Sequence, residues 1–323
     1  MTQTSCSNYI IAQAHFPGRD INFLIYRPSD AWVFLEQLRS VVSVTVVSSP
    51  LEEVAESIEG AVGWHIPTSI LQQLTALRWI QTTSSGTDHL AEFMNQAGTD
   101  IALSTVRGMN AAVVAEFALM AVLAHKWHLF TLRQQQGQHL WQQIPTIASE
   151  NLTALVVGLG AIGTLVAGHL QHLGMRVLGV RRNSEPHPAV DGVFAMTRLE
   201  DALREADFVV LTVALSEQTR SLIDASALSA MKRSAYVINV SRGEVVDEDA
   251  LHGALCAGDI AGATLDVTTQ EPYPQDGPLW STPNLFLTPH NAGQRADYAQ
   301  QAAKIWAENV QRYARGLPPL PAA

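Results

Sequence analysis

The sequence has little of what marks secreted, membrane-bound or nucleic-acid-binding proteins. It contains two cysteines, Cys6 and Cys256, and no CxxC pair, which predicts a cytoplasmic protein without a disulfide framework. Charged residues make up 15% of the chain, the net charge is −10, and the longest basic run is Arg181-Arg182, which argues against a nucleic-acid partner. There is no basic N-terminal segment before an apolar run, and no run approaches ~18 apolar residues, so neither a signal peptide nor a membrane partner is expected.

What is present is typical of an α/β enzyme of two domains. The 323 residues are 47% hydrophobic, enough for roughly two cores at ~150 residues each. Short apolar runs alternate with segments of helical spacing, which predicts parallel sheets with right-handed crossovers. In the first part of the chain the predicted strands are 43–49, 60–65, 79–84 and 101–106, and the predicted helices are 51–60 and 66–77.

The alternation is clearest from residue 153 onward. The predicted strands there are 153–158, 176–180, 208–213, 236–240, 262–267 and 285–289, followed by a helix over 294–316. Nearly continuous apolar strands are typical of a parallel sheet covered on both faces. Residues 111–143 read as one long helix with an arm at 131–143, either packed between domains or subunits or simply part of a core. Trp64, Trp127 and Trp141 are expected to be packing residues, with the alternative that a tryptophan of the arm reaches the active site of a neighbouring subunit, and Trp280 is expected in a core.

The stretch GLGAIG lies between a predicted strand and a predicted helix, and a second strand follows. This βαβ context is what a dinucleotide-binding glycine loop requires. Gly158 permits a tight turn, Gly160 lets the backbone approach a pyrophosphate, and Gly163 allows close packing of helix and strand. The helix N-terminus supplies free N–H groups. The predicted cofactor-binding residues here are Gly158, Leu159, Gly160, Ala161, Ile162 and Gly163.

Arg181 and Arg182 follow the second strand, where an acidic residue would bind the ribose of NAD. A guanidinium can pair bidentately with a 2′-phosphate, and Asn183 adds a neutral donor. We therefore predict a preference for NADP(H), with NAD(H) possible. The alternative is that both arginines are solvated and either cofactor is used.

Three polar stretches follow later strands: NVSRGEVVDEDAL, LDVTTQEP and LTPHNAG. They place an arginine, acids and a histidine where ligands bind in such sheets. These stretches, together with GLGAIG, occur in the order seen in the D-isomer-specific 2-hydroxyacid dehydrogenase family, which the chain resembles over nearly its whole length. SSGTDHL at 84–90 resembles the substrate loop of that family.

The resemblance implies the following roles. His290 is the general acid, Glu271 favours its charged form, and Arg242 binds the carboxylate of the substrate. Substrate also contacts Ser85, Gly86 and Thr87, and Asp266 accepts from the nicotinamide amide. The remaining residues expected to line the cofactor are Val213, Thr219 and Val240.

Departures from the family pattern are Thr268, Thr269 and Ala214, which leave pocket shape and loop rigidity open. Glu271 disfavours formate oxidation, because the formate-oxidising members carry glutamine there. His125 and His128 lack carboxylate or cysteine partners in the sequence, so no metal site is expected.

The resemblance thus predicts two Rossmann-like or flavodoxin-like α/β domains with parallel sheets and a cofactor cleft between them. Residues 1–106 plus 289–323 form the substrate domain and 107–288 the NAD(P)-binding domain, with a homodimer through 111–143. The predicted activity is reduction of a small 2-keto acid, such as glyoxylate or hydroxypyruvate, to a D-2-hydroxy acid. Alternatives are a reductase of bulkier aryl or branched 2-keto acids, and a non-enzymatic NAD(P)H-sensing protein on the same fold.

Overall fold

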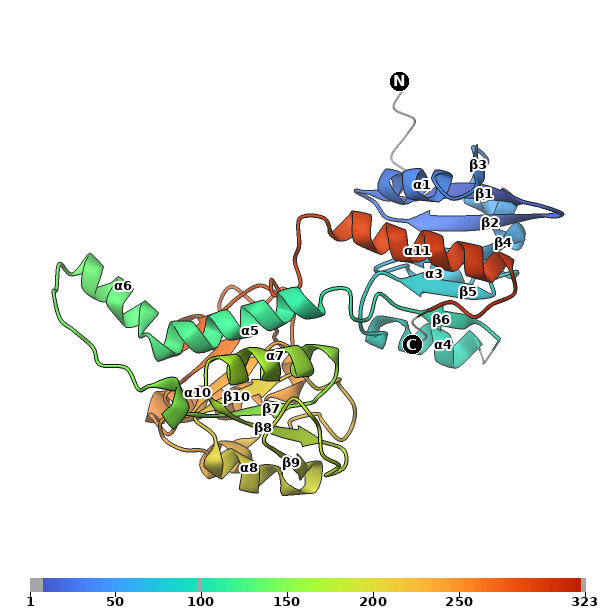
Figure 1. Ribbon diagram of the computed structural model, residues 1–323. Coiled ribbons are helices and arrows are strands. Elements are labelled where there is room, and N and C mark those ends of the chain that lie inside the picture. Colours follow the sequence, from blue (N-terminus) through green and yellow to red (C-terminus); the bar gives the residue numbers. More distant parts are fainter. Residues whose placement is uncertain (1–7, 98–99, 321–323) are drawn as a thin grey trace. The chain divides into compact units, whose positions relative to one another are not determined.

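The computed structural model describes residues 8–97 and 100–320, and the chain divides into two compact units (Figure 1). Unit 1 comprises Met1–Met109 and Arg295–Ala323, and unit 2 comprises Asn110–Gln294. The boundaries thus differ from those expected at 106/107 and 288/289. The shift matters at the second boundary, because it puts residues 289–294, and with them His290, in unit 2.

Unit 2 contains a parallel sheet of seven strands in the order β13-β12-β11-β10-β7-β8-β9. The order of the strands reverses between β7 and β10, which is the point where such sheets bind ligands at their carboxyl ends. Six of the strands lie at the positions predicted from the sequence, and β9 was not predicted. The strands are β7 (Thr153–Val157), β8 (Arg176–Arg181), β9 (Gly192–Ala195), β10 (Phe208–Leu211), β11 (Tyr236–Asn239), β12 (Gly262–Leu265) and β13 (Leu285–Leu287).

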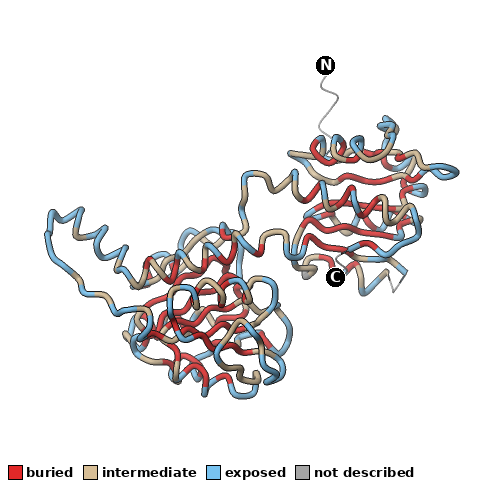
Figure 2. Tube along the Cα trace, viewed as in Figure 1, coloured by how far each residue is buried: buried red, intermediate tan, exposed pale blue. Residues whose placement is uncertain are grey.

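Helices cover both faces of this sheet, which is why its central strands are buried along their whole length (Figure 2). One apolar cluster joins α5 and α7 to the sheet, and a second joins α8, α9 and α10 to the opposite side chains of the same strands. The helices are α5 (Ala111–Lys126), α6 (Leu129–Gly137), α7 (Ala161–His172), α8 (Leu199–Glu205), α9 (Ala225–Ala230) and α10 (Glu248–Ala257).

Unit 1 is also a sheet covered by helices, but its sheet is mixed rather than parallel. The order is β3-β1-β2-β4-β5-β6, and β1 is antiparallel to both of its neighbours. The predicted parallel pairing is found among β2, β4, β5 and β6, but β1 and its antiparallel pairing were not predicted. Pro17-Gly18 turns the chain directly from β1 into β2 as a hairpin. The strands are β1 (Ile10–Phe16), β2 (Arg19–Tyr26), β3 (Ser43–Val47), β4 (Ile58–Gly63), β5 (Trp79–Thr82) and β6 (Ala102–Ser104).

The core of unit 1 is closed by the last helix of the chain. Trp306 is fully buried and meets Phe23 edge to face with ring centroids 5.8 Å apart, a favourable geometry for aromatic rings. The helices are α1 (Ala31–Arg39), α2 (Leu51–Val54), α3 (Thr68–Leu71), α4 (Ala91–Ala97) and α11 (Tyr298–Ala314). Short 3₁₀ turns lie in both units: η1 (Ala55–Ser57) and η2 (Asp88–Leu90) in unit 1, and η3 (Ser149–Asn151), η4 (Met196–Arg198), η5 (Gly243–Val245) and η6 (Pro278–Ser281) in unit 2.

The long helix predicted over 111–143 is two helices. The chain breaks at His128, whose φ of 54° is left-handed, and α6 ends at Gly137. The inner face of α5 belongs to the core of unit 2, whereas α6 buries no residue and contacts the sheet through Phe130, whose ring centroid lies 4.8 Å from that of Phe286. The expectation that the tryptophans are packing residues was also wrong, since four of them are exposed: Trp64 (65%), Trp127 (56%), Trp141 (97%) and Trp280 (56%).

Across residues 8–97 and 100–320, no single helix is both long and apolar enough to cross a membrane. The bent pair α5 and α6 passes that test only when the two helices are taken together, and by length and composition alone.

His125 is a half-buried aromatic contact between α5 and the sheet. Its ring stacks on Tyr236, with centroids 3.9 Å apart, and meets Phe208 edge to face. Burial, with a smaller contribution from His128, lowers the pKa of His125 from 6.5 to about 4. Burial raises the pKa of Tyr236 to about 12, so the phenol that underlies His125 stays neutral.

This lowered pKa predicts an acid-dependent loss of stability. Above pH 6.5 His125 is neutral in both folded and unfolded chains, whereas between pH 6.5 and about 4 only the unfolded chain takes up the proton. The free energy of unfolding should therefore fall as pH drops through this window, by up to about 1.4 kcal/mol per pH unit. Urea unfolding from pH 7.5 to 4 should show a shallower decline for His125→Phe than for wild type. The exposed His172→Phe should keep the wild-type slope, and equal slopes in all three proteins would contradict the assignment.

Candidate functional site

The glycine turn of unit 2 has the conformation that its sequence predicts. Gly158 has a φ of 100°, and a Cβ there would lie 2.9 Å from Cγ1 of Val213. A Cβ at Gly163 would lie 1.9 Å from the carbonyl oxygen of Gly158, so only glycine lets α7 pack this closely on the turn. A Cβ at Gly160 would meet open space.

This turn is a cradle that fits a dinucleotide pyrophosphate. Gly160 is the N-cap of α7 and is exposed, so the first amides of the helix face open space instead of packed side chains. Unpaired amides at a helix N-terminus favour an anionic group. The other predicted loop residues, Leu159, Ala161 and Ile162, lie on this turn and on the first residues of α7, and none of them is buried.

Arg181 and Arg182 lie beside the turn. Arg181 is the last residue of β8, and the carbonyl of the preceding Val180 accepts from the N–H of Gly158 at 2.8 Å. Arg182 and Asn183 are exposed. Among the described residues, neither guanidinium has a hydrogen-bond or ion-pair partner, so the structure leaves both donors available to a ligand.

The other predicted cofactor residues lie at the carboxyl ends of β10 and β11. Val213 is half-buried against the glycine turn, and Val240 is buried directly after β11. Thr219 is 8% exposed, and its hydroxyl donates to the carbonyl of Ala214 at 2.7 Å while accepting from the N–H of Ser216 at 2.8 Å. Thr219 therefore shapes the loop after β10 with its own hydrogen bonds.

Asp266, after β12, organises the segment that carries His290. It is 2% exposed. Its Oδ1 accepts from the hydroxyl of Thr288 at 2.6 Å and from the N–H of Asn291 at 2.7 Å, and its Oδ2 accepts from the N–H of Ala292 at 2.9 Å. A carboxylate accepts about four hydrogen bonds, so one position remains for an outside donor. This anchoring role was not predicted from the sequence. The sequence signal for it is an acidic residue, Asp266, at the end of a buried strand that precedes the loop of His290.

His290 and Glu271 form a direct pair. Nδ1 of His290 lies 2.8 Å from Oε2 of Glu271, and the two side chains are 48% and 39% exposed. The other carboxylate oxygen accepts from the N–H of Thr268 at 3.1 Å, which fixes the orientation of Glu271. With Nδ1 on the carboxylate, the histidine presents Nε2 away from its partner. The φ of His290 is 51°, a strained value for a residue with a side chain, and its N–H is held by the carbonyl of Asp266 at 2.7 Å.

Arg242 lies on the loop after β11, and a buried amide supports that loop. Asn239 donates to the carbonyl of Arg242 at 2.8 Å and accepts from the N–H and the hydroxyl of Ser241. A Cβ on Gly243 would lie 2.0 Å from the backbone carbon of Thr268, so the Arg242 loop and the Glu271 loop are in backbone contact. Glu248 further ties the second loop, accepting from the N–H of Thr269 at 2.5 Å. The structure thus brings the loops of Arg242, Glu271 and His290 to one edge of the sheet.

The predicted substrate loop belongs to unit 1. Ser85, Gly86 and Thr87 follow β5, Ser85 is exposed, and the N–H of Gly86 lies 3.3 Å from the hydroxyl of Ser84. The loop therefore offers backbone amides at the carboxyl end of a parallel strand, whereas the Arg242, Glu271 and His290 loops belong to unit 2.

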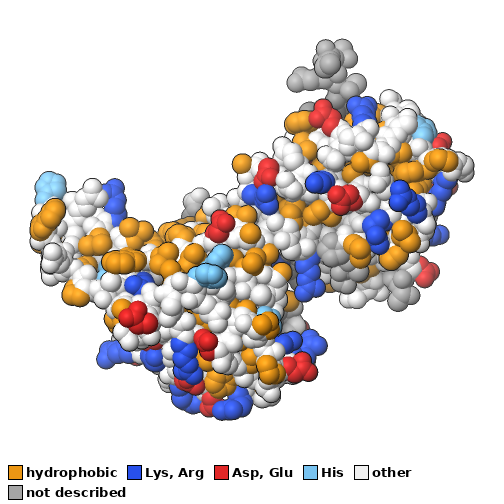
Figure 3. Space-filling view, in the orientation of Figure 1, with side chains coloured by type: hydrophobic (Ala, Val, Ile, Leu, Met, Phe, Trp, Pro, Cys, Tyr) orange, Lys and Arg blue, Asp and Glu red, His pale blue; other side chains and the backbone are white. Residues whose placement is uncertain are grey.

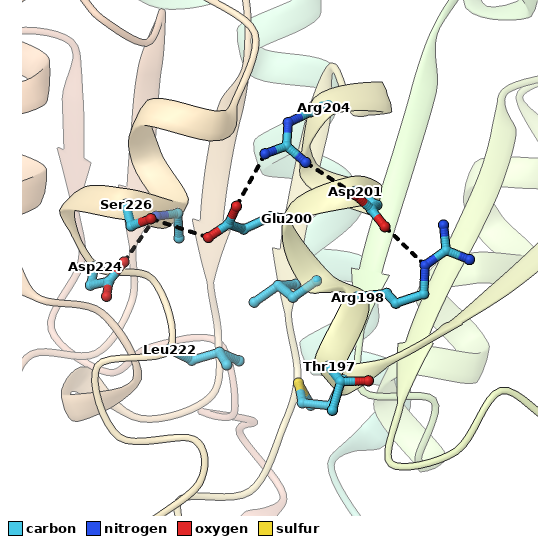
Figure 4. Close-up of a pocket in the computed structure, with 11 residues that line it drawn as sticks. Thr197, Arg198, Glu200, Asp201, Arg204, Leu222, Asp224 and Ser226 are labelled. Atoms are coloured by element: carbon cyan, nitrogen blue, oxygen red, sulfur yellow. Dashed lines mark hydrogen bonds and ion pairs between the residues drawn. The ribbon is translucent and has the colours of Figure 1, made fainter.

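A cavity of about 530 Å³ between α8 and α9 is not a competing site (Figure 4). Its arginines are already paired: Arg198 with Asp201 at 2.8 Å, and Arg204 with Glu200 and Asp201 at 3.1 Å each. These ion pairs are exposed and contribute little to stability. In the part of the chain that the structure describes, no group of three or more metal-ligating side chains occurs.

A dinucleotide cradle at the switch point of a parallel sheet, with an imidazole–carboxylate pair at the same edge, defines the class of NAD(P)-dependent dehydrogenases. Comparison with known proteins narrows the class. Residues 119–292 match the family model of the D-isomer specific 2-hydroxyacid dehydrogenase, NAD binding domain. The chain belongs to this family and is an NAD(P)-dependent oxidoreductase, as its sequence predicted, and the family acts on small 2-keto or 2-hydroxy acids.

Individual relatives agree with this assignment. The chain is 33% identical to a glyoxylate reductase of Korarchaeum cryptofilum over 79% of this chain and 78% of that protein. It is 32% identical to glyoxylate/hydroxypyruvate reductase B of Yersinia enterocolitica over 81% and 84% of the two chains. Its structure resembles that of a D-isomer specific 2-hydroxyacid dehydrogenase from Xanthobacter autotrophicus solved with NADPH and MES, with a TM-score of 0.81, 28% identity and coverage of 93% and 96%. The α/β fold with two mostly parallel sheets is confirmed.

The close approach of Gly243 to the Thr268 backbone predicts that adding a methyl group at this glycine is destabilising. Gly243→Ala places a methyl group about 2.0 Å from backbone atoms that cannot move independently, so the two loops must separate. We expect a loss of about 1–3 kcal/mol in the free energy of unfolding and reduced turnover of 2-keto acids. Urea unfolding and initial rates measure both. Gly253→Ala in α10, where a Cβ meets open space, is the control and should be neutral or slightly stabilising. Equal behaviour of the two variants would contradict the close approach.

Proposed function

We propose that the enzyme reduces a small 2-keto acid of the glyoxylate or hydroxypyruvate type to a D-2-hydroxy acid and prefers NADPH. The hydrogen bond between Nδ1 of His290 and Glu271 carries the proposal, because it orients an imidazole as a proton donor. The glyoxylate and hydroxypyruvate reductases among the relatives support the substrate class.

In this proposal His290 donates a proton from Nε2 to the carbonyl oxygen of the substrate. Glu271 accepts a hydrogen bond from Nδ1 and thereby holds the ring with Nε2 facing away from the carboxylate. Arg242 pairs with the substrate carboxylate, and the amides of Ser85, Gly86 and Thr87 bind the same group. The nicotinamide, when bound, supplies the hydride.

The cofactor would lie on the glycine turn of unit 2, with its pyrophosphate at the N-terminus of α7. Arg181, Arg182 and Asn183 would bind the 2′-phosphate of NADP(H), and Asp266 would use its remaining acceptor position for the nicotinamide amide. Val213, Thr219 and Val240 would line the cofactor. NAD(H) would bind more weakly, because the arginines gain little without the phosphate.

One observation favours a second candidate substrate. Trp64 is 65% exposed directly after β4, in the same unit as the Ser85–Thr87 loop, and an exposed indole suits an aryl side chain. Reduction of phenylpyruvate in preference to glyoxylate would support a bulkier substrate. Binding of NADPH without turnover of any 2-keto acid would instead support a sensing role.

The hydrogen-bonded pair of His290 and Glu271 predicts how far substitution of each residue lowers kcat. His290→Gln removes the proton donor and should lower kcat for glyoxylate or hydroxypyruvate by about 10²–10⁴. Glu271→Gln keeps the shape but loses the charge, so its kcat should lie between those of wild type and His290→Gln. Steady-state kinetics with NADPH measure both. His172→Gln on the exposed surface is the control, and unchanged kcat in His290→Gln would overturn the assignment of the general acid.

The two arginines predict the cofactor preference. Wild type should show a higher kcat/KM for NADPH than for NADH, and Arg181→Asp/Arg182→Ala should reduce the ratio of the two values by at least tenfold. Arg176→Asp/Arg204→Ala makes the same change in net charge at arginines that pair with carboxylates, and should keep the wild-type ratio. An NADH preference in the wild type would refute the phosphate assignment while leaving the enzyme intact.

We also propose that the enzyme works in a reducing compartment such as the cytoplasm, because the exposed thiol of Cys256 stays free there.

We propose in addition that the chain forms a homodimer through the α5–α6 region. Hydrophobic side chains gather over these helices (Figure 3), and an apolar groove of about 380 Å³ lies between Glu116 and Leu129. Trp127 and Leu129 are more than half exposed there. An apolar surface of this kind favours a protein partner, here a second copy of the chain.

The dimer proposal is tested by light scattering. Trp127→Glu/Leu129→Glu should convert a dimer into a monomer, because two carboxylates would be buried in the interface. Trp280→Glu changes an equally exposed tryptophan outside α5 and α6 and should remain dimeric. A monomeric wild type would exclude the proposal.

A further inference from the structure

Thr83 lies directly before the predicted substrate loop, and its N–H, hydroxyl and carbonyl groups each form a hydrogen bond. The residue is fully buried. Its N–H donates to the carbonyl of Gly63 at 2.9 Å, its hydroxyl accepts from Nη1 of Arg27 at 2.9 Å, and its carbonyl accepts from the hydroxyl of Tyr298. Three separate parts of unit 1 thus hold one residue, at the point where the chain leaves β5.

Arg27 is itself fixed in place. Its Nε donates to Oδ1 of Asp30 at 2.6 Å, and Nη2 donates to Oδ2 of the same carboxylate, a bidentate pair. The guanidinium also lies 5.2 Å from the centre of the Phe34 ring, and the side chain is only 13% exposed. The two oxygens of Asp30 and the ring of Phe34 fix the orientation of the planar guanidinium. Its remaining nitrogen, Nη1, donates to the hydroxyl of Thr83.

Tyr298 acts from the first turn of α11. Burial raises the pKa of Tyr298, with Arg27 opposing this shift and Asp30 adding to it. The phenol therefore keeps its proton at neutral and moderately alkaline pH and can donate to the carbonyl of Thr83 throughout that range. The loop beyond Thr83 has fewer ties: Ser85 is exposed, and the N–H of Gly86 reaches only the hydroxyl of Ser84, at 3.3 Å.

We propose that Arg27, through the hydroxyl of Thr83, is a positioning residue for the substrate carboxylate. With Tyr298 it fixes the start of the loop, and thereby the direction in which the amides of Ser85, Gly86 and Thr87 point. This inference rests on the proposed function, because it assigns those amides to the carboxylate. Arg27 does not touch substrate in this proposal, because its guanidinium is held by Asp30, Phe34 and Thr83.

The test compares two variants of Thr83 in the full-length enzyme. Thr83→Val replaces the hydroxyl with a methyl group and leaves Nη1 of Arg27 without its acceptor, whereas Thr83→Ser keeps the hydroxyl. We expect Thr83→Val to raise KM for the 2-keto acid about tenfold, with kcat changed less than about threefold and the Kd for NADPH unchanged. Thr83→Ser should match the wild type. Arg27→Lys, which loses the planar fork, should resemble Thr83→Val.

Hydrogen exchange separates positioning from general destabilisation. In Thr83→Val the hydrogen-bonded amides of residues 83 and 84 should exchange about tenfold faster, while those of β7, β10 and β11 in unit 2 keep wild-type protection. A folded Thr83→Val with wild-type KM and exchange overturns the proposal. So does a loss of kcat and NADPH affinity in parallel with KM, which would indicate general destabilisation.

Oxalate binding to the NADPH complex, measured by calorimetry, distinguishes this inference from the proposed function. If the wild type reduces no 2-keto acid, the proposed function fails. The role of Arg27 then stands only if oxalate binds the wild type and Thr83→Ser about tenfold more tightly than Thr83→Val. Equal binding in these proteins, or no binding to the wild type, overturns it.

Discussion

The buried carboxylate of Asp266 determines where His290 lies. Three donors from residues 288–292 converge on this one side chain, and its backbone carbonyl holds the N–H of His290 as well. Without such an anchor, a histidine with a φ of 51° would relax to an ordinary backbone conformation. The position of the exposed His290 therefore depends on the buried carboxylate of Asp266.

The same arrangement recurs at other strand ends. Asn239 is fully buried at the end of β11 and bonds to both Ser241 and Arg242, and Thr83 is fully buried just after β5, directly before the predicted substrate loop. Asp266 and Asn239 bond directly to the loops that carry His290 and Arg242, whereas Thr83 bonds to Gly63, Arg27 and Tyr298 at the point where its own loop begins. Because a buried polar group left unpaired is costly, each anchor restricts its loop to conformations that satisfy it.

Much of unit 2 was predictable, because its signals are local. Strands buried on both faces are continuously apolar, and Gly158 and Gly163 occupy positions where any Cβ would collide with the turn. The mixed sheet of unit 1 was missed, although Pro17-Gly18 marks its hairpin. The break at His128 and the exposure of Trp64 and Trp280 depend on tertiary packing, which periodicity does not report. The residues proposed for the site were found by motif, whereas their anchors were not, since a buried threonine or asparagine looks like any other residue in a strand.

The two ends of β8 show why the arginines beside the glycine turn point to a ligand. Arg176, at the start of the strand, lies 2.6 Å from a carboxylate oxygen of Glu205. Arg181, at the other end, meets no carboxylate among the described residues, and neither does Arg182. Both strand ends carry a cation, but only the one beside the helix N-terminus lacks a protein counterion. Two unneutralised guanidinium groups next to an already positive helix end repel one another, and an anionic ligand removes that repulsion. In the proposed function, a phosphate on the ribose would supply the missing charge, whereas a ribose hydroxyl would supply none. The same electrostatics that would bind the cofactor would then also discriminate between its two forms.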